Sequence, residues 1–257
     1  MARKPEAPAD ARGLFCYGLH AVHAVLARSP TSVLECWMRE GVLSEGLAEL
    51  LERAGAAGLS VQRVPVATLD RLAGSGTHQG VIVRRRPPPA LTFEHWFEER
   101  IKPNPSPLVL AIDQIQDPHN LGAALRLADA AGVQGILITR DRSVGLTPVV
   151  AKVASGALDT VPLIQVTNLV RALEALKAAG LWVVGASGEA RETLFELDLA
   201  RPLVWVIGGE GAGLRRLTRE TCDYLARIPM RGTVESLNLG TAAAVCLFET
   251  LRQQGAR

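Results

Sequence analysis

Polar side chains stand out in three short stretches in the last 150 residues of this chain, Asp117–Arg126, Gly208–Gly213 and Ile228–Asn238. Each stretch follows an apolar run of strand length and leads into a segment with helical periodicity. In a parallel α/β sheet, the carboxyl ends of the strands meet at one edge, where the ligand crevices of such folds lie. The three stretches are therefore predicted to converge on one site, whose candidate catalytic residues are Asn120, Arg126, Glu210, Ser236 and Asn238.

The residue types at this site narrow its chemistry. They include no cluster of metal ligands and no Ser/His/Asp or Cys/His pair, so neither a metal centre nor a covalent nucleophile is predicted. The glycine-rich run Gly208–Gly213 matches neither the dinucleotide fingerprint nor the P-loop. Glycines alone could mean a tight turn, but a turn does not need the carboxylate of Glu210. The run is interpreted as a loop whose backbone approaches a ligand closely.

The first stretch, Asp117–Arg126, has two interpretations. Asn120 follows a turn and could simply cap a helix. Arg126 could be solvated, yet its neighbours Leu125 and Leu127 predict a largely buried helix, and a buried guanidinium needs partners.

Taken together, the three stretches resemble the signature motifs of the SpoU-type (TrmH-type) RNA ribose 2′-O-methyltransferases, a branch of the SPOUT superfamily. The family's Asn and Arg of the first motif fall on Asn120 and Arg126, its G-x-E-G-x-G motif on Gly208–Gly213, and its S-L-N motif on Ser236–Asn238. The chain departs from the pattern at Leu239-Gly240-Thr241, where relatives more often carry a Val-Ser-Val type run. This departure affects local helix packing more than chemistry.

The resemblance implies a cofactor, a substrate class and a fold. S-adenosylmethionine would be held mostly by backbone groups, RNA would be the substrate, and no metal would be needed. The resemblance also implies a trefoil knot, although general topology rules argue against knots. The implied cofactor-binding residues are Gly208, Gly209, Gly211, Ile228 and Leu237, with the loop around Ala186 nearby.

Methylation of a ribose 2′-hydroxyl requires deprotonation of a very weak acid and its alignment with a sulfonium methyl group. The family often assigns the role of general base to the counterpart of Arg126, but arginine stays protonated in proteins. We therefore interpret Arg126 as a group that positions phosphate and stabilises the developing alkoxide. Glu210 is then the alternative proton acceptor or the group that orients Arg126, and Ser236 and Asn238 complete the hydrogen-bond frame.

The elements that must position these residues form a regular alternation, which indicates a parallel α/β sheet. Strands are predicted at residues 108–113, 135–139, 161–166, 181–186, 203–207 and 225–228, and helices between them at 121–131, 148–155, 169–179, 213–220 and 237–252.

An earlier alternation of strands and helices predicts a small α/β/α domain at residues 13–86. Within it, Tyr17–Val22 and His78–Val81 resemble the two ends of an N-terminal RNA-binding domain found in one family subgroup, which looks like a kink-turn-binding ribosomal protein. That subgroup resembles the bacterial 23S rRNA guanosine-2′-O-methyltransferases, which implies a guanosine of 23S rRNA as substrate. A tRNA ribose is one alternative, and a non-catalytic rRNA-binding or assembly factor on the same scaffold is another.

Proline marks the boundary between the two domains. A short amphipathic segment, Phe93–Ile101, lies between two proline-rich runs, first Arg-Arg-Arg-Pro-Pro-Pro and later a run of alternating prolines. Prolines cannot sit inside regular elements, so neither run is predicted to lie inside a helix or strand. The predicted division is a disordered lead-in at residues 1–12, a substrate-binding domain at 13–86, a linker at 87–106 and a methyltransferase domain at 107–257.

Composition sets the remaining limits. The chain has 257 residues, 48% hydrophobic and 21% charged, and no stretch apolar enough to span a membrane, so a cytoplasmic protein is expected. Its four cysteines are widely spaced, which favours reduced thiols over a disulfide framework. A net charge of +2 proves no nucleic-acid partner. Arginine clusters near the motifs could meet phosphates or could be solvated surface.

The final segment, Leu237–Leu251, is apolar around most of a helix. Such a helix must be buried on more than one side, while a sheet covers only one. We therefore predict a homodimer formed by the catalytic domain, as the family resemblance also implies. The alternative is that the segment Phe93–Ile101 covers the second side within one chain.

Overall fold

The structure is a computed structural model, and it describes residues 13–74, 77–209, 211 and 213–255. The chain forms two compact units. The N-terminal unit comprises Met1–Pro89 and Leu146–Asp159, and the C-terminal unit comprises Ala90–Gly145 and Thr160–Arg257. Each is described separately.

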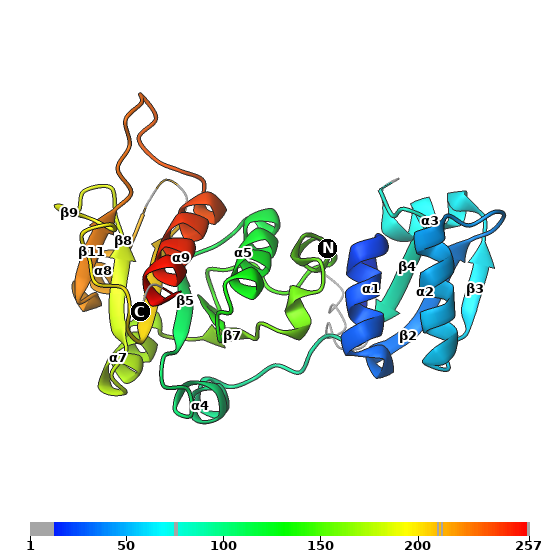
Figure 1. Cartoon of the computed structure of the whole chain (residues 1–257), viewed down its shortest axis with the longest axis horizontal. Helices are drawn as coiled ribbons and strands as arrows, with labels where there is room; N and C mark the ends of the chain where they lie inside the picture. The colour runs from blue at the N-terminus through cyan, green and yellow to red at the C-terminus, as the bar shows by residue number, and fades with distance from the viewer. Residues whose placement is uncertain (1–12, 75–76, 210, 212, 256–257) are drawn as a thin grey trace, which may run out of the picture. The chain divides into compact units, whose positions relative to one another are not determined.

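The C-terminal unit is built on a seven-stranded sheet in the order β7-β6-β5-β10-β8-β11-β9 (Figure 1). Every neighbouring pair is parallel, which confirms the predicted parallel α/β sheet. The trefoil knot stays a prediction from the family resemblance. The strands are β5 (Leu108–Asp113), β6 (Ile136–Thr139), β7 (Leu163–Val166), β8 (Trp182–Ala186), β9 (Glu192–Thr193), β10 (Leu203–Gly208) and β11 (Tyr224–Arg227).

Helices cover both faces of this sheet. Side chains alternate between the two faces along a strand, so neighbouring residues of β10 face opposite helices. Val204 and Val206 pack in a core with Trp96 and the helix α7 (Leu169–Ala178). Trp205 donates from Nε1 to Oγ1 of Thr250, 2.9 Å away on the helix α9 (Leu239–Gly255), which lies beside the helix α5 (Pro118–Ala130) (Figure 1). The helix α8 (Arg216–Thr221) precedes β11.

The amphipathic segment between the prolines belongs to the C-terminal unit. It forms the short α-helix α4 (Phe93–Trp96) and the π-helical segment η3 (Phe97–Ile101). Trp96 is fully buried, and its Nε1 donates to the carbonyl of Gln134 at 2.9 Å. Because its partners lie on the Val204 face of the sheet, this segment does not cover the outer side of α9.

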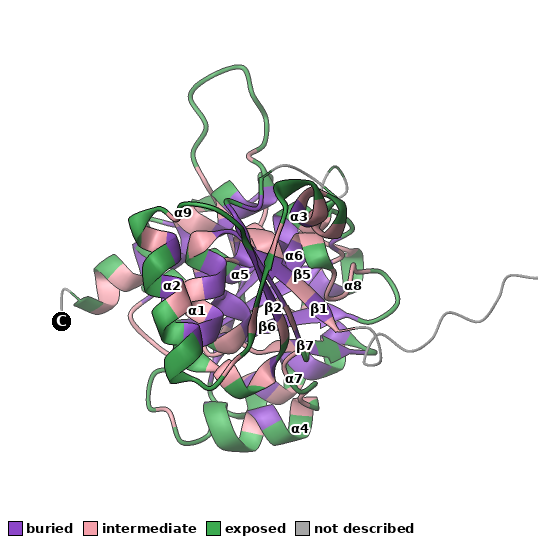
Figure 2. Cartoon of the chain, turned by 90° about the vertical axis from the view of Figure 1, so that its right-hand side faces the viewer, coloured by how far each residue is buried: buried purple, intermediate pink, exposed green. Residues whose placement is uncertain are grey.

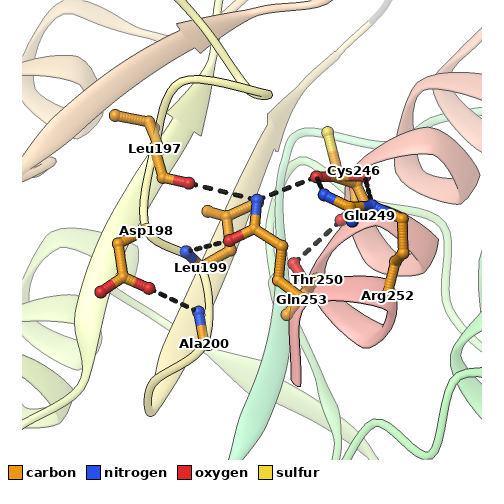
Figure 3. Close-up of polar contacts among 9 residues, drawn as sticks. All are labelled: Leu197, Asp198, Leu199, Ala200, Cys246, Glu249, Thr250, Arg252 and Gln253. Carbon is orange, nitrogen blue, oxygen red and sulfur yellow. Dashed lines mark hydrogen bonds and ion pairs between the residues drawn. The ribbon is translucent and has the colours of Figure 1, made fainter. Parts of the chain in front are cut away.

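The end of α9 is anchored by polar contacts to the segment that precedes β10 (Figure 3). Oε1 of Gln253 accepts from the backbone N–H of Leu199 at 2.8 Å, and Nε2 of Gln253 donates to the carbonyl of Leu197 at 3.2 Å. Glu249 accepts from Gln253 and from Arg252, and the hydrogen bond from Arg252 lowers the pKa of this glutamate. These contacts hold α9, and with it the third motif at its start, against the sheet.

The N-terminal unit is the predicted α/β/α arrangement. Its four-stranded sheet has the order β1-β4-β2-β3, with helices packed in separate cores on its two faces. The strand β1 was not predicted from the sequence. The elements are β1 (Leu14–Tyr17), α1 (Leu19–Arg28), η2 (Pro30–Ser32), β2 (Val33–Arg39), α2 (Glu45–Ala56), β3 (Val61–Val64), α3 (Val66–Ala73) and β4 (Val81–Arg85).

A segment from the middle of the chain completes this unit. It contains the helix α6 (Pro148–Ala154) and the turn η4 (Ala157–Asp159), which the sequence-based division places with residues 107–257. The carboxylate of Asp159 accepts two hydrogen bonds of 2.6 Å from the guanidinium of Arg85, and both side chains are almost completely buried.

The four cysteines carry free thiols. Burial raises the pKa of Cys16 and Cys246 to about 12 and that of Cys36 to about 11. Cys222 is only half-buried, yet desolvation raises its pKa to about 12 as well. In the part of the chain that the structure describes, no helix is long and apolar enough to cross a membrane.

Candidate active site

A cavity of about 580 Å³ lies at the carboxyl ends of β8, β10 and β11. All six residues implied as cofactor contacts line it: Ala186, Gly208, Gly209, Gly211, Ile228 and Leu237. Ser236 and Asn238 line it too. The second and third motifs are therefore brought together at the predicted edge of the sheet.

Glycine is required at two positions of the cavity wall because backbone atoms from other residues lie very close to them. A Cβ on Gly208 would lie 2.2 Å from the carbonyl carbon of Gly213, and a Cβ on Gly209 would lie 2.7 Å from the carbonyl oxygen of Gln114. Real Cβ contacts are essentially never this short. The described glycines of this run thus form a wall built of backbone, as expected for a ligand held by main-chain groups. Glu210 lies outside the described residues.

The first motif reaches the third through a pair of amides. Nδ2 of Asn238 donates to Oδ1 of Asn120 at 2.9 Å, and Oδ1 of Asn238 accepts from the backbone N–H of Gly240 at 2.9 Å. Asn120 is buried and does not cap its helix, because Asp117 is the N-cap residue of α5 and accepts from the backbone N–H of His119. The capping interpretation of Asn120 is therefore wrong.

Arg126 differs from its expected environment. The helix α5 is largely buried, as predicted, but the Arg126 side chain is exposed. Among the described residues it has no hydrogen-bond or ion-pair partner, and it is not part of the described lining of the cavity. The inference that Arg126 is a buried guanidinium was wrong because a helix buried on most sides still exposes one stripe.

The arginines near the second motif are paired with carboxylates. Arg219, on the cavity wall, donates to Glu189 at 2.5 Å, and Arg216 pairs with Glu220 at 2.8 Å. Arg215 pairs with Asp113, a fully buried residue at the end of β5 that the sequence analysis did not single out. Because all three arginines have carboxylate partners, this cluster is less suited to bind phosphate than the sequence alone suggests.

The segment between β11 and α9 contributes the outer rim of the cavity. Met230, Glu235 and Ser236 belong to this segment and line the cavity. The segment loops away from the sheet, and its residues 230–236 are exposed (Figures 1 and 2). Within the described ranges, the structure holds no group of three or more His, Cys, Asp or Glu side chains placed to bind a metal ion.

Two family models match the chain in succession. Residues 15–90 match the RNA 2′-O ribose methyltransferase substrate binding family, and residues 107–248 match the SpoU rRNA Methylase family. The chain belongs to the SpoU rRNA methylase family. The resemblance seen in the three motifs is thereby confirmed.

Curated relatives of this SpoU methylase match over nearly their whole length. The 23S rRNA (guanosine-2′-O-)-methyltransferase RlmB of Shewanella oneidensis is 49% identical over 238 residues, which cover 93% of this chain and 96% of the relative. The protein of the same name from Pseudomonas aeruginosa is also 49% identical, over 243 residues, and the match covers 93% of this chain and 96% of the relative.

Solved structures share the fold. A crystal structure of an RNA 2′-O ribose methyltransferase has a TM-score of 0.80 at 28% identity and covers 95% of this chain and 89% of its own. The SpoU methyltransferase AviRb of Streptomyces viridochromogenes, in complex with AdoMet, has a TM-score of 0.79 at 25% identity and covers 96% of this chain and 92% of its own.

Proposed function

We propose that this SpoU methylase transfers a methyl group from S-adenosylmethionine to the ribose 2′-hydroxyl of a guanosine in 23S rRNA. The observation that carries the proposal is the cavity, which the second and third motifs line together. The hydrogen bond between Asn120 and Asn238 connects the first motif to this cavity. The relatives at 49% identity bear the name of this activity, and AviRb is a SpoU methyltransferase solved with AdoMet.

The described residues fit the cofactor. A cavity of about 580 Å³ lies within the roughly 300–1,000 Å³ typical of small-molecule sites. Its wall at Gly208 and Gly209 is backbone that any side chain would displace, which suits a ligand recognised by main-chain N–H and C=O groups. When bound, S-adenosylmethionine supplies an electrophilic methyl group on a sulfonium.

The polar side chains have two tasks, to orient the ribose and to manage its proton. Asn238 is fixed by Asn120 and by the backbone of Gly240, so its position at the cavity is set before substrate arrives. We assign Ser236 and Asn238 to the hydrogen-bond frame around the 2′-hydroxyl. Arg126 would stabilise the developing alkoxide and position phosphate, and Glu210 would accept the proton or orient Arg126.

Arg126 is exposed and does not belong to the described lining of the cavity of its own chain. A second copy of the chain can complete the site in which Arg126 meets the reacting atoms. The outer side of α9 carries Thr241, Val245 and Phe248, with Phe248 47% exposed. Their spacing of four and three residues places them in one stripe. We propose that two chains pair through this stripe and that the pairing completes each active site.

The two parts of the chain would divide the work. We propose that residues 13–86 select the RNA and that residues 107–257 transfer the methyl group, joined by the segment 87–106. The match to the substrate-binding family at residues 15–90 supports this division. Since rRNA is the proposed substrate, we also propose a cytoplasmic location.

Ribose-methylation mapping tests the function directly. Total RNA from cells with the gene, without it, and with the gene restored would be compared position by position. We expect one 2′-O-methylguanosine of 23S rRNA to vanish on deletion and return on complementation. Loss of a tRNA methyl group would favour the tRNA alternative, and no change at any position would favour a non-catalytic rRNA-binding factor.

A further inference from the structure

Asp113 is a fully buried carboxylate at the last position of β5. A carboxylate removed from water must be matched by donors, or it destabilises the fold. Its donors come from a distant part of the chain. Oδ1 accepts from Nε of Arg215 at 2.6 Å and lies 2.6 Å from Nη2 of the same residue, and Oδ2 accepts from the backbone N–H of Arg215 at 2.9 Å.

The backbone of Asp113 makes a further contact with the same segment. Its carbonyl oxygen accepts from the backbone N–H of Gly209 at 3.0 Å. Gly209 lies near the start of the glycine-rich run Gly208–Gly213, and Arg215 lies two residues after its end. Asp113 therefore holds both sides of the run, the first by its main chain and the second by its side chain. The loop is closed by the bond from Gly213 N–H to the carbonyl of Gly209, 3.1 Å long.

This loop forms one wall of the cavity. Gly209, Gly211, Gly213 and Leu214 all line it. Glycines have the largest conformational freedom of any residue and no side chain with which to pack. A wall made of glycines has no side-chain packing to stabilise its shape, so contacts from outside the loop add to the internal hydrogen bond described above.

We propose that Asp113 is a positioning residue for the cofactor: through Arg215 and Gly209 it holds the described part of the cavity wall, Gly209, Gly211 and residues 213–215, in the arrangement that receives S-adenosylmethionine. The inference rests on the proposed function, because it presumes that this cofactor occupies the cavity. A ligand that binds a preformed wall does not have to order that wall on binding. Loss of the contacts between Asp113 and its partners Gly209 and Arg215 therefore weakens cofactor affinity. The chemical step, whose side chains are anchored by the Asn120–Asn238 pair, is affected less.

A purely structural role would make a different prediction, and the chain contains a matched control for it. Asp159 and Arg85 form an equally short buried ion pair in the N-terminal unit, with side chains 6% and 4% exposed. Neither residue belongs to the described lining of the cavity. Asp159→Asn therefore removes a buried carboxylate charge without touching the glycine loop.

The test is calorimetric titration of the full-length protein with S-adenosylmethionine in the absence of RNA. Asp113→Asn turns one acceptor oxygen into a donor that faces the N–H groups of Arg215. We expect its Kd to rise about tenfold or more, the equivalent of losing one or two net hydrogen bonds. Arg215→Gln should raise Kd as well, and the double variant should lose less than the sum of the two because they share one interaction. Asp159→Asn should bind like the wild type.

Steady-state kinetics adds a readout that general destabilisation would not produce. For Asp113→Asn, KM for the cofactor should rise while kcat at saturating cofactor stays within about threefold of the wild type. A wild-type Kd in Asp113→Asn, or an equal rise in Asp159→Asn, would overturn the inference and leave the proposed function standing. If the wild type itself did not bind the cofactor, the proposed function would fail. If Asp113→Asn did not fold, the Kd of Arg215→Gln would decide the question, because the Arg215 side chain is 37% exposed.

Discussion

Asn238, in the third motif, uses both ends of its amide group, and one of them contacts the first motif. Its Nδ2 donates to Asn120, while its Oδ1 accepts from the first turn of α9. An aspartate at position 238 would lack the donor, and an aspartate at position 120 would introduce a charge at a buried site. This explains physically why both motifs carry asparagine, whereas their spacing in the sequence says nothing of their contact.

Arg126→Ala should abolish methyl transfer and leave cofactor affinity unchanged. The side chain is exposed and is not part of the described cavity lining, so its proposed work is on the substrate and not on the cofactor. Loss of one charge-stabilising donor lowers kcat by about a hundredfold or more. Methylation assays and calorimetric titration with S-adenosylmethionine measure the two effects. Arg171→Ala, at an exposed position of α7, is the control and should change neither. A collapse of cofactor affinity in the folded Arg126→Ala protein would contradict the assigned role.

Gly208→Ala should prevent cofactor binding. The added methyl group would sit 2.2 Å from the backbone of Gly213, so the wall of the cavity would have to move. Backbone cannot yield as a flexible side chain can, and the expected loss of affinity is at least about tenfold. Gly188 also lines the cavity, but nothing lies within 4 Å of a Cβ placed there. Equal affinities for Gly208→Ala and Gly188→Ala would show that the close approach has no bearing on the ligand.

At the scale of elements, the C-terminal helix depends on a few buried polar contacts for its place. Oγ1 of Thr250 accepts from the indole of Trp205, which is fully buried, and donates to the carbonyl of Cys246. Gln253 and Glu249 hold the last turns against residues 197–199 (Figure 3). A helix with small apolar residues along much of its length could slide along the sheet, and these directional bonds fix its register.

Thr250→Val should destabilise the protein by about 1–3 kcal/mol, because it keeps the shape but leaves the indole donor of Trp205 without an acceptor in a buried site. The measurement is equilibrium unfolding in denaturant. Thr221→Val is the matched control, since the hydroxyl of Thr221 also bonds the carbonyl four residues earlier but near the surface. Its effect should be about 0.5 kcal/mol or less. If the two variants were equally stable, the Trp205 bond would not anchor the helix.

The elements that could be predicted from the sequence are those with their own periodicity or apolar run. The strand β5 is buried at all six positions, as its continuous apolar run indicated, and α5 begins at the predicted turn. The strand β1 was missed because its four residues gain their structure from pairing with β4, where Cys16 lies opposite Val83. The Asp113–Arg215 contact was missed for a related reason, since it joins positions 102 residues apart. Pairings of this kind leave no local pattern.

At the scale of the whole molecule, the chain alternates between its two units. It leaves the N-terminal unit after Pro89, returns to it at Leu146, and leaves it again after Asp159. The returning segment is held by the buried Arg85–Asp159 pair. A fragment beginning at residue 107 would therefore lack Trp96 and Ile101 from the core of the C-terminal unit and would carry a segment whose partners are missing. Experiments on this protein are best made with the full chain.

The outer stripe of α9 leads to the last prediction, which concerns assembly. Phe248 is 47% exposed on a helix whose other face is buried, and the segment Phe93–Ile101 packs on the opposite face of the sheet. Phe248 and the partly buried Val245 form the apolar part of this stripe, and we propose that they lie in a protein interface. We expect sedimentation equilibrium of the wild type to give twice the chain mass at micromolar concentration.

Phe248→Arg should convert that dimer to monomer, because a charge at the centre of an apolar interface lacks a partner. The monomer should bind S-adenosylmethionine, since Phe248 is not part of the described cavity lining, but should lose methylation of RNA because the proposed pairing completes each site. Leu217→Arg, at a residue of α8 that is 56% exposed, is the control and should leave mass and activity unchanged. A Phe248→Arg monomer that still methylates RNA would exclude dimerisation as a requirement for catalysis, and Arg126 would then have to act within its own chain.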